Sequence, residues 1–326
     1  MASSPSPSSP AAPSGRWSAE RYPRSAVTDL VVATPVFLDL TFVGLESLPA
    51  LGEERFAADL LRSPGGGAIT AVGAARLGLS VAVAAPLGDD VAGDVVRATL
   101  AEEGIEAIAT RSAPRTPTTA VMPVGGDRAM VTVDSGARAS VADVAAGSPR
   151  AVSVNLDQLH VVPPGAFAYT TCGDDEARAF LGRPPAALAG ARALFVNERE
   201  ALGLSGAASV EEAAATLAEQ AETVVVTRAA EGAIACSRGE ILTAAAERVE
   251  QPLDTTGAGD VLVAAYIWAD LRGADPADRL RWAVLYASLA VTKPTGVGGA
   301  LREAELIEAG AARGLTAPPF AGVTQV

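Results

Sequence analysis

Histidine and cysteine are almost missing from this chain. Its 326 residues contain one histidine, His160, and two cysteines, Cys172 and Cys236. A Ser-His-Asp or Cys-His mechanism would have to use His160, because no other imidazole exists. The cysteines are far apart in the sequence and have no Cys or His partner at metal-site spacing, so they are expected to be small buried thiols.

Basic residues and long apolar runs are also scarce. The chain has 25 Lys and Arg against 38 Asp and Glu, with a formal net charge of −13. This balance argues against a nucleic-acid or anionic-membrane partner, either of which needs a basic surface. No apolar run reaches the ~18 residues of a membrane span, and residues 1–25 lack the apolar core of a signal peptide. We expect a cytoplasmic protein with a disordered Ser/Pro/Ala-rich tail over 1–25.

The remaining composition is typical of an α/β protein, with 49% hydrophobic residues and 32 glycines. We predict one domain over 26–320, built as a doubly wound, mostly parallel sheet with helices on both faces, because continuous apolar strands alternate with helices. The predicted strands are 28–34, 80–88, 105–110, 158–162, 193–196, 223–227 and 232–236. The predicted helices are 91–103, 210–220, 258–272, 276–292 and 302–313, with one more after the three glycines of 64–78 and two more starting near 174 and 197.

Two segments do not fit this alternation and predict a small β-sheet lid. Residues 37–63 contain an extended stretch at 56–63. Residues 113–134 contain two extended runs joined by Gly125-Gly126-Asp127, a sequence suited to the positive φ angles of a tight hairpin. An exposed lid edge offers a pairing surface, so a homodimer through the lid is a further expectation.

The stretch DTTGAGD (254–260) leads into the apolar run of a buried helix. A helix beginning at Gly257 or Ala258 presents unpaired N–H groups and the positive end of its dipole. Glycines permit close backbone approach, so a phosphate oxygen could contact several amides there. Asp260 would then be a base beside an anion site, as phosphoryl transfer to a hydroxyl requires. The alternative is ordinary helix capping, by Asp254 or Thr255.

DTTGAGD also resembles the carboxy-terminal signature of the ribokinase (phosphofructokinase B-type) carbohydrate kinases. Three other stretches resemble further motifs of that family, in the same order along the chain. They are PGGGAITAVGAARLG (64–78) followed by PLGDDVAG (86–93), FVNEREA (195–201) and TRAAEG (227–232). The resemblance covers residues 28–313 and implies the ribokinase-like fold, with ATP and Mg²⁺ as cofactors.

The resemblance implies a catalytic role for DTTGAGD. Asp260 would be the base, and the amides of Gly257, Ala258 and Gly259 would form the anion hole. Asn197 and Glu200 would support the magnesium-phosphate end, Glu200 through water; their i, i+3 spacing places them on one helix face. A capping arrangement in the first helical turn is the alternative for that pair.

The resemblance also implies the binding residues. Those along the nucleotide would be Thr227, Gly232 and Thr255, with Val284 and Ala287 flanking adenine unless these two are simply core residues. Asp39 would bind acceptor hydroxyls, as a buried carboxylate needs hydrogen-bonding partners; an exposed loop aspartate is the alternative. Gly65, Gly66 and Gly67 would let the acceptor approach the backbone.

Three positions depart from the family pattern. Phe37 and Ile69 stand where asparagines are common, which predicts a more apolar acceptor pocket. Ala229 replaces the first glycine of the nucleotide loop and restricts its backbone angles. None of these touches Asp260, so we expect altered acceptor choice and retained activity.

The sequence therefore predicts an ATP- and Mg²⁺-dependent kinase acting on a primary hydroxyl of a small sugar or sugar-like molecule. A nucleoside kinase of the same fold is the alternative favoured by Phe37 and Ile69. A silent sugar- or nucleotide-binding protein is a third possibility, against which the intact DTTGAGD counts. A dinucleotide-dependent oxidoreductase is disfavoured, because GGGAIT lacks the G-x-G-x-x-G spacing. The acceptor's identity and any monovalent-cation requirement stay open.

Overall fold

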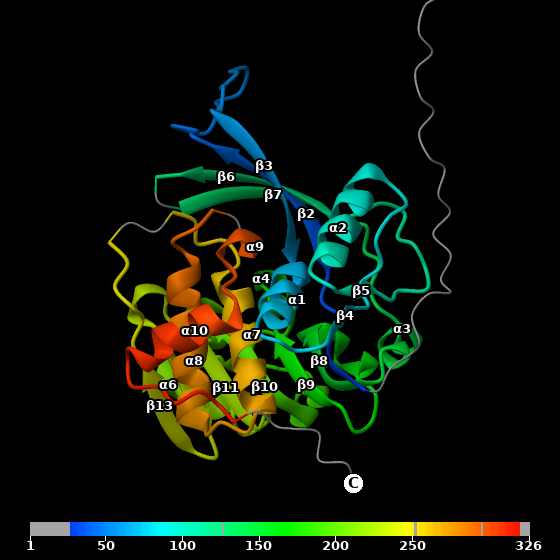
Figure 1. The fold of residues 1–326 in the computed structure, drawn as a ribbon. Coiled ribbons are helices and arrows are strands. Elements are labelled where there is room, and N and C mark those ends of the chain that lie inside the picture. Colours follow the sequence, from blue (N-terminus) through cyan, green and yellow to red (C-terminus); the bar gives the residue numbers. More distant parts are fainter. Residues whose placement is uncertain (1–26, 126, 251–252, 295, 320–326) are drawn as a thin grey trace, which may run out of the picture.

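A computed structural model describes residues 27–125, 127–250, 253–294 and 296–319. Their fold has two sheets: a large one inside the body of the molecule and a small one across one end of it (Figure 1). The tail expected over 1–25 lies outside the described residues. Among those residues, no helix has the length and apolar character needed to cross a membrane.

The large sheet has nine strands within the described residues, in the order β13-β12-β11-β10-β9-β8-β1-β4-β5. All neighbours from β11 to β5 pair in parallel, whereas β12 and β13 are antiparallel. The strands are β1 (Thr28–Val32), β4 (Val81–Val83), β5 (Glu106–Ala107), β8 (Pro149–Asn155), β9 (Phe167–Thr171), β10 (Ala191–Asn197), β11 (Thr223–Thr227), β12 (Ala233–Ser237) and β13 (Glu240–Ala244).

The chain leaves β1 toward β4 and β5, and later returns to the other side of β1 through β8 and the strands beyond it. The boundary between β1 and β8 is therefore the topological switch point of the sheet. In open α/β sheets, ligands bind outside the carboxyl ends of the strands at this point. The fold thus indicates a binding site beyond the ends of β1 and β8.

Two apolar cores flank the sheet because successive strand residues face opposite sides. In β1, Leu30 and Val32 belong to one core, and Val31 belongs to the other. The first core is shared with α1 (Gly67–Arg76), α2 (Val91–Glu102), α7 (Ala258–Leu271), α8 (Pro276–Ala290), α9 (Gly296–Gly299) and α10 (Glu303–Ala311). The second is shared with α3 (Val141–Ala146), α4 (Asp174–Ala179), α5 (Glu198–Ser205) and α6 (Val210–Leu217).

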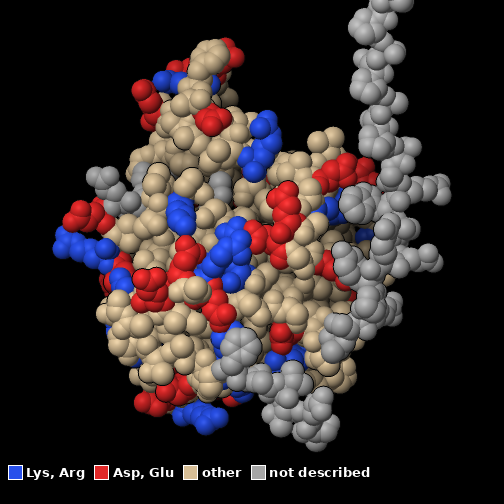
Figure 2. Space-filling model, in the orientation of Figure 1, with Lys and Arg blue, Asp and Glu red and all other residues tan. Residues whose placement is uncertain are grey.

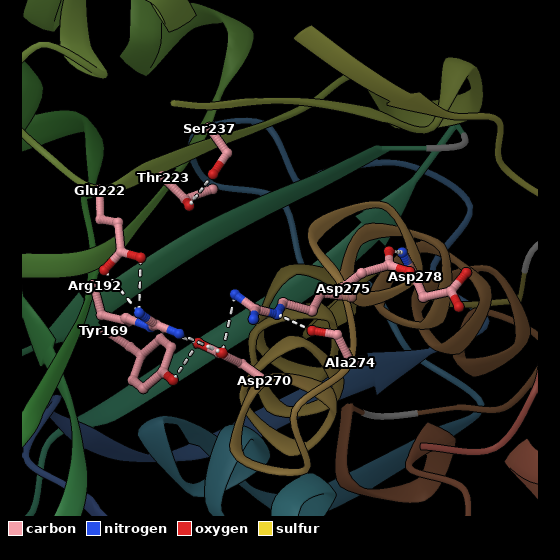
Figure 3. Close-up of polar contacts among 10 residues, drawn as sticks. Tyr169, Arg192, Glu222, Thr223, Ser237, Asp270, Ala274, Asp275 and Asp278 are labelled. Carbon is pink, nitrogen blue, oxygen red and sulfur yellow. Dashed lines mark hydrogen bonds and ion pairs between the residues drawn. The ribbon is translucent and has the colours of Figure 1, made fainter. Parts of the chain in front are cut away.

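Helix α7 is apolar on all sides, and its residues from Val261 to Leu271 are all buried. A polar network fixes its far end (Figure 3). Asp270 accepts two hydrogen bonds from the Arg192 guanidinium, at 2.8 and 3.0 Å, and one from the Tyr169 hydroxyl at 2.7 Å. Arg279 adds an ion pair at 3.0 Å. A helix held in this way presents its other end, where DTTGAGD lies, in a defined position.

The small sheet has the order β3-β2-β6-β7 and is formed by β2 (Val36–Val43), β3 (Asp59–Gly66), β6 (Thr118–Val124) and β7 (Asp127–Val133). Strand β2 pairs antiparallel with β3 and parallel with β6, and β6 and β7 form the predicted hairpin. Figure 1 shows this sheet as a layer above α1 and α9. The predicted fold class, a doubly wound parallel sheet with a small β-sheet lid, is confirmed. Met130, Val131 and Val133 of β7 are exposed; the homodimer stays a prediction.

Some elements differ from the prediction. The strand expected over 158–162 is instead part of a 3-10 helix, η1 (Leu156–Val161), whose Leu156, Leu159 and Val161 are buried. A short apolar run does not by itself distinguish a strand from a buried turn of helix. Strands β8, β9 and β13 were not predicted. The helix expected after the three glycines of 64–78 begins at the last of them, Gly67, because residues 64–66 end strand β3.

On the face shown in Figure 2, basic and acidic side chains of the described residues are interspersed. Ion pairs also join distant segments of the chain, such as Arg76 with Glu103 at 2.5 Å and Arg272 with Glu303 at 2.5 Å.

Candidate active site

A cavity of about 520 Å³ lies at the switch point, between the start of the lid and the carboxyl ends of the central strands. Its lining combines the end of β1, the turn into α1, the start of α4 and the first turn of α7. The lining residues are Thr34, Pro35, Phe37, Gly66, Gly67, Thr70, Asp134, Arg138, Ser153, Asn155, Asp157, Thr171, Gly173, Asp174, Asp175, Glu176, Arg178 and Asp260. Of the predicted catalytic and acceptor residues, Asp260, Phe37, Gly66 and Gly67 line this cavity, whereas Asp39, Gly65 and the loop 257–259 are not among its lining residues.

Asp260 lies in the first turn of α7 and borders this cavity. The Thr70 hydroxyl donates to its Oδ1 atom at 3.4 Å, from the neighbouring helix α1. Burial raises the pKa of Asp260 to about 7, and the negative charge of Asp39 adds to the shift, while Thr70 and the charge of Arg128 oppose it. A carboxylate with a pKa near neutrality suits a general base at physiological pH.

The loop before Asp260 has the geometry of an anion site. Gly257, the residue before α7, has φ 78°, which a side chain would disfavour, and no side chain caps the helix. Within the described residues, the amides of Gly257 and Gly259 have no protein acceptor, whereas Ala258 donates to the Thr255 carbonyl oxygen at 3.3 Å. Two of the three predicted amides are therefore available to a ligand.

The capping alternative for this loop is wrong. Neither Asp254 nor Thr255 caps α7. Instead, the Asp254 carboxylate accepts a hydrogen bond from the Thr256 amide at 2.8 Å, and the Thr255 hydroxyl accepts one from Arg128 of the lid at 2.8 Å. The loop is thus braced from outside its own helix, so the helix amides stay unoccupied by side chains.

Ile69 does not line the cavity, contrary to the prediction for the acceptor pocket. It is 1% exposed and packs beneath the glycine loop: a β-carbon added to Gly257 would lie 2.7 Å from its Cδ1 atom, and one added to Gly296 would lie 2.4 Å from it. Ile69 therefore supports the anion-hole loop from below. The next residue, Thr70, faces the cavity instead.

Asp39 lies in strand β2 of the lid and is half-buried, so the alternative of an exposed loop aspartate is wrong. Its carboxyl group lies against Gly65, where an added β-carbon would be 2.0 Å from Oδ2. Burial raises the pKa of Asp39 to about 6; the charge of Asp254 adds to the rise, and a hydrogen bond with Thr119 opposes it. The mutual repulsion of Asp39 and Asp260 indicates that these carboxylates share one electrostatic environment.

Two buried hydroxyl groups at the bottom of the cavity were not predicted. Thr34 follows β1, and Ser153 lies in the adjacent strand β8; they are 7% and 1% exposed. Neither Oγ atom has a hydrogen-bond partner among the described residues. Buried polar groups usually have partners, so unpaired hydroxyls lining a cavity indicate a polar ligand. In the sequence, Thr34 could have been noticed as a hydroxyl residue at the end of the first apolar run, whereas Ser153 lies inside β8 and gave no such signal.

Asn197 and Glu200 form the reciprocal capping box that was the alternative for this pair. The Asn197 side chain accepts from the Glu200 amide at 2.9 Å, and the Glu200 carboxylate accepts from the Asn197 amide at 2.8 Å. Burial raises the pKa of Glu200 to about 7, and the charges of Asp174 and Glu176 add to the rise.

The described residues contain no cluster of three or more His, Cys, Asp or Glu side chains that could hold a metal ion. Mg²⁺ commonly keeps several waters and is held by one or two carboxylates together with substrate phosphates. The described residues therefore do not fit a site made of protein ligands alone, and the role of Glu200 toward Mg²⁺ through water stays a prediction.

The predicted nucleotide residues lie in three elements. Thr227 ends β11 and is the register partner of Asn197. Gly232 has φ 94°, and a β-carbon there would lie 2.1 Å from the Ala244 carbonyl oxygen, so this turn requires glycine. Ala229, the departure from the family pattern, has the left-handed φ of 46°. In α8, Val284 is buried in the first core and Ala287 packs against it, as the core alternative stated.

A family model and several solved structures match the chain. A family model described as pfkB family carbohydrate kinase matches residues 52–145 and 160–301 of the chain. A putative ribokinase from Agrobacterium tumefaciens is 22% identical, with a TM-score of 0.75, over 88% of this chain and 99% of that one.

Two further solved structures are similar. One is Arabidopsis thaliana ribokinase complexed with ribose and ATP, at 21% identity and a TM-score of 0.70, over 87% of this chain and 99% of that one. The other is ribokinase from Cryptococcus neoformans in complex with ADP. It is 20% identical, with a TM-score of 0.68, over 86% of this chain and 99% of that one. These likenesses show the fold.

Proposed function

Because the chain belongs to the pfkB family of carbohydrate kinases, we propose that it transfers the γ-phosphoryl group of ATP to a primary hydroxyl of a small sugar or sugar-like acceptor. One observation carries this proposal. The Asp260 carboxyl group borders the cavity at the same helix end where the amides of Gly257 and Gly259 have no protein acceptor among the described residues.

Each part of the site has a task in this reaction. Asp260 takes the proton from the acceptor hydroxyl as its oxygen bonds to the γ-phosphorus and ADP leaves. The amides of Gly257 and Gly259, at the positive end of the α7 dipole, stabilise the charge on the moving phosphoryl group. ATP would lie along Thr227 and Gly232. Mg²⁺ bound with ATP neutralises phosphate charge, and Glu200 would orient it through water.

The cavity's charge bears on the acceptor. Six acidic side chains line it against two arginines, and Arg138 is already paired with Asp134 at 2.7 Å. An anionic acceptor would meet repulsion from these carboxylates and from the ATP phosphates. The buried hydroxyls of Thr34 and Ser153 instead suit an uncharged polyhydroxyl molecule. A nucleoside is the second candidate, because the Phe37 ring lines the cavity and could contact a base.

The test is Asp260→Asn, compared with the parent by ADP release across sugars, sugar phosphates, sugar acids and nucleosides. We expect the variant to fold and to bind ATP, and to lose at least about 10²-fold in turnover, as loss of a general base does. Asp94→Asn is the matched control, because Asp94 is an exposed aspartate in the first turn of α2. Near-parent turnover in Asp260→Asn would remove Asp260 from the role of base.

A further inference from the structure

The lid reaches the DTTGAGD loop through one arginine. Arg128 lies in β7, near the tip of the β6–β7 hairpin, and its Nη1 atom donates to the Thr255 hydroxyl oxygen at 2.8 Å. The two residues are 127 positions apart in the sequence. Because Thr255 begins the turn that leads to Gly257, the contact joins the lid to the loop that would form the anion hole.

The same guanidinium acts on the proposed base. Three groups from different elements act on the Asp260 carboxyl group: Thr70 of α1 donates to it, and it feels the charges of Asp39 in β2 and Arg128 in β7. Burial and the charge of Asp39 raise its pKa, whereas Arg128 lowers it by favouring the charged carboxylate. Arg128 thus donates to the loop, and its charge also acts on the Asp260 carboxyl group.

We propose that Arg128 is a positioning residue carried by the lid, which binds Thr255 to hold the hairpin against the Gly257–Gly259 loop. This inference rests on the proposed function. With the hairpin held there, a fixed positive charge lies beside the volume in which phosphoryl transfer builds up negative charge. The contact also ties lid position to the shape of the loop, so an open lid would leave the loop without this brace.

The chain offers a matched control. Arg62 lies in β3 of the same lid and is exposed, and it has no part in the site described above. Arg62→Gln removes the same charge from the lid as Arg128→Gln. Arg128→Lys keeps the charge but loses the planar fork of donors. Thr255→Val keeps the shape of Thr255 and removes the oxygen that Arg128 binds.

Steady-state kinetics with ATP and an acceptor that the parent phosphorylates form the first arm. We expect Arg128→Gln to lose about 10²-fold in kcat, the scale of one donor to a transition-state charge, with KM values within a few-fold of the parent. The acid limb of its pH–rate profile moves to higher pH, because Asp260 loses a charge that favours ionisation. We expect Arg128→Lys to lose less kcat than Arg128→Gln, and Thr255→Val to lose kcat as Arg128→Gln does. The kcat of Arg62→Gln should equal that of the parent.

A second arm does not depend on turnover. Titration of the Asp260 carboxyl carbon by NMR should show a higher pKa in Arg128→Gln than in the parent, and no change in Arg62→Gln. Unchanged kcat and an unchanged carboxyl titration in Arg128→Gln would overturn the inference while leaving the kinase intact. A parent that forms no ADP with any acceptor would overturn the proposed function, and the NMR arm would still decide whether Arg128 acts on Asp260. If Arg128→Gln fails to fold, the kinetics and the NMR titration are both measured on Thr255→Val instead.

Discussion

The carboxyl group of Asp39 occupies the space that a side chain at Gly65 would need. A β-carbon on Gly65 would lie 2.0 Å from Oδ2 of Asp39, although the two residues belong to different strands of the lid. Asp39 can hold its position only because position 65 has no side chain. The paired glycines of the sequence motif therefore serve the lid aspartate as well as any approach of the acceptor to the backbone.

Gly65→Ala should displace the Asp39 carboxyl group and weaken acceptor binding. We expect the acceptor KM to rise at least tenfold, or about 1.4 kcal/mol, with the Kd for ATP nearly unchanged, measured by kinetics and calorimetry. Gly190→Ala is the control, because an added β-carbon there meets nothing within 4 Å. An unaltered acceptor KM in Gly65→Ala would argue against Asp39 as an acceptor ligand.

The raised pKa of Asp260 predicts opposite effects of pH on activity and stability. Its folded pKa of about 7 lies above the model-peptide value, so folding favours the protonated form. The cost of ionising it is absent below pH about 4, grows between 4 and 7, and is fully present above 7. Asp260→Asn should therefore have a higher Tm than the parent at pH 8, and this difference should disappear at the acid end.

The pKa of Asp260 also sets the pH dependence of the parent's activity. Its kcat/KM should fall as the pH decreases through about 7, because the base becomes protonated. The stability half of the prediction is measured by thermal unfolding of both proteins from pH 4 to 8. A difference in Tm that stays constant over this range would contradict it.

Asp270 predicts the reverse pH dependence. Burial alone would raise its pKa, but hydrogen bonds from Arg192 and Tyr169 and the charge of Arg279 hold the pKa below its usual value. Its contribution to stability is therefore present above pH about 4 and is lost as the pH falls further.

Asp270→Asn would leave Arg192 and Arg279 without their buried counter-charge. We expect a loss of about 3–5 kcal/mol in the free energy of unfolding at pH 7, measured by urea denaturation, and a smaller difference from the parent near pH 3. The more exposed Asp278, which forms an i, i+3 pair with Arg281, provides the control Asp278→Asn, with a change below about 1 kcal/mol.

Ala229→Gly should stabilise the protein. Ala229 holds φ 46°, where a β-carbon costs about 1–2 kcal/mol, and the added freedom of glycine in the unfolded chain offsets about 0.5–1 of that. We expect the free energy of unfolding of Ala229→Gly, measured by chemical denaturation, to exceed that of the parent by up to about 1 kcal/mol. The neighbouring Ala230 has no positive φ among the described residues, so Ala230→Gly should lose stability; a loss in both variants would refute this account of the turn.

Local sequence patterns were enough to predict much of the site. The position of α7, the glycines before it and the carboxylate in its first turn could be predicted because helix ends are set by residues a few positions apart. The hairpin of the lid was predictable for the same reason, since its turn chemistry is contained in consecutive residues. The site roles of these residues remain predictions that the experiments above address.

The errors arose where a residue's neighbours come from distant segments. Ile69 looked like part of the acceptor pocket, but the packing of α1 against the α7 loop buries it beneath Gly257 and Gly296. The run 158–162 had the apolar content of a strand, yet the sheet takes β8 and β9 on either side of it. The partner of Thr255 likewise comes from a distant segment, because its hydroxyl oxygen accepts a hydrogen bond from an arginine in the lid.

By itself, the sequence determined the alternation of strands and helices, the glycine-rich start of α7 and the carboxylate beside it, because hydrophobic periodicity and helix-end chemistry act over a few residues. Only the tertiary structure decided that β1 and β8 are neighbours, that Thr34 and Ser153 line one cavity, and that Arg128 reaches Thr255. Those contacts depend on strand order and on the placement of the lid, which result from burying both faces of the sheet at once and which no short stretch of sequence encodes.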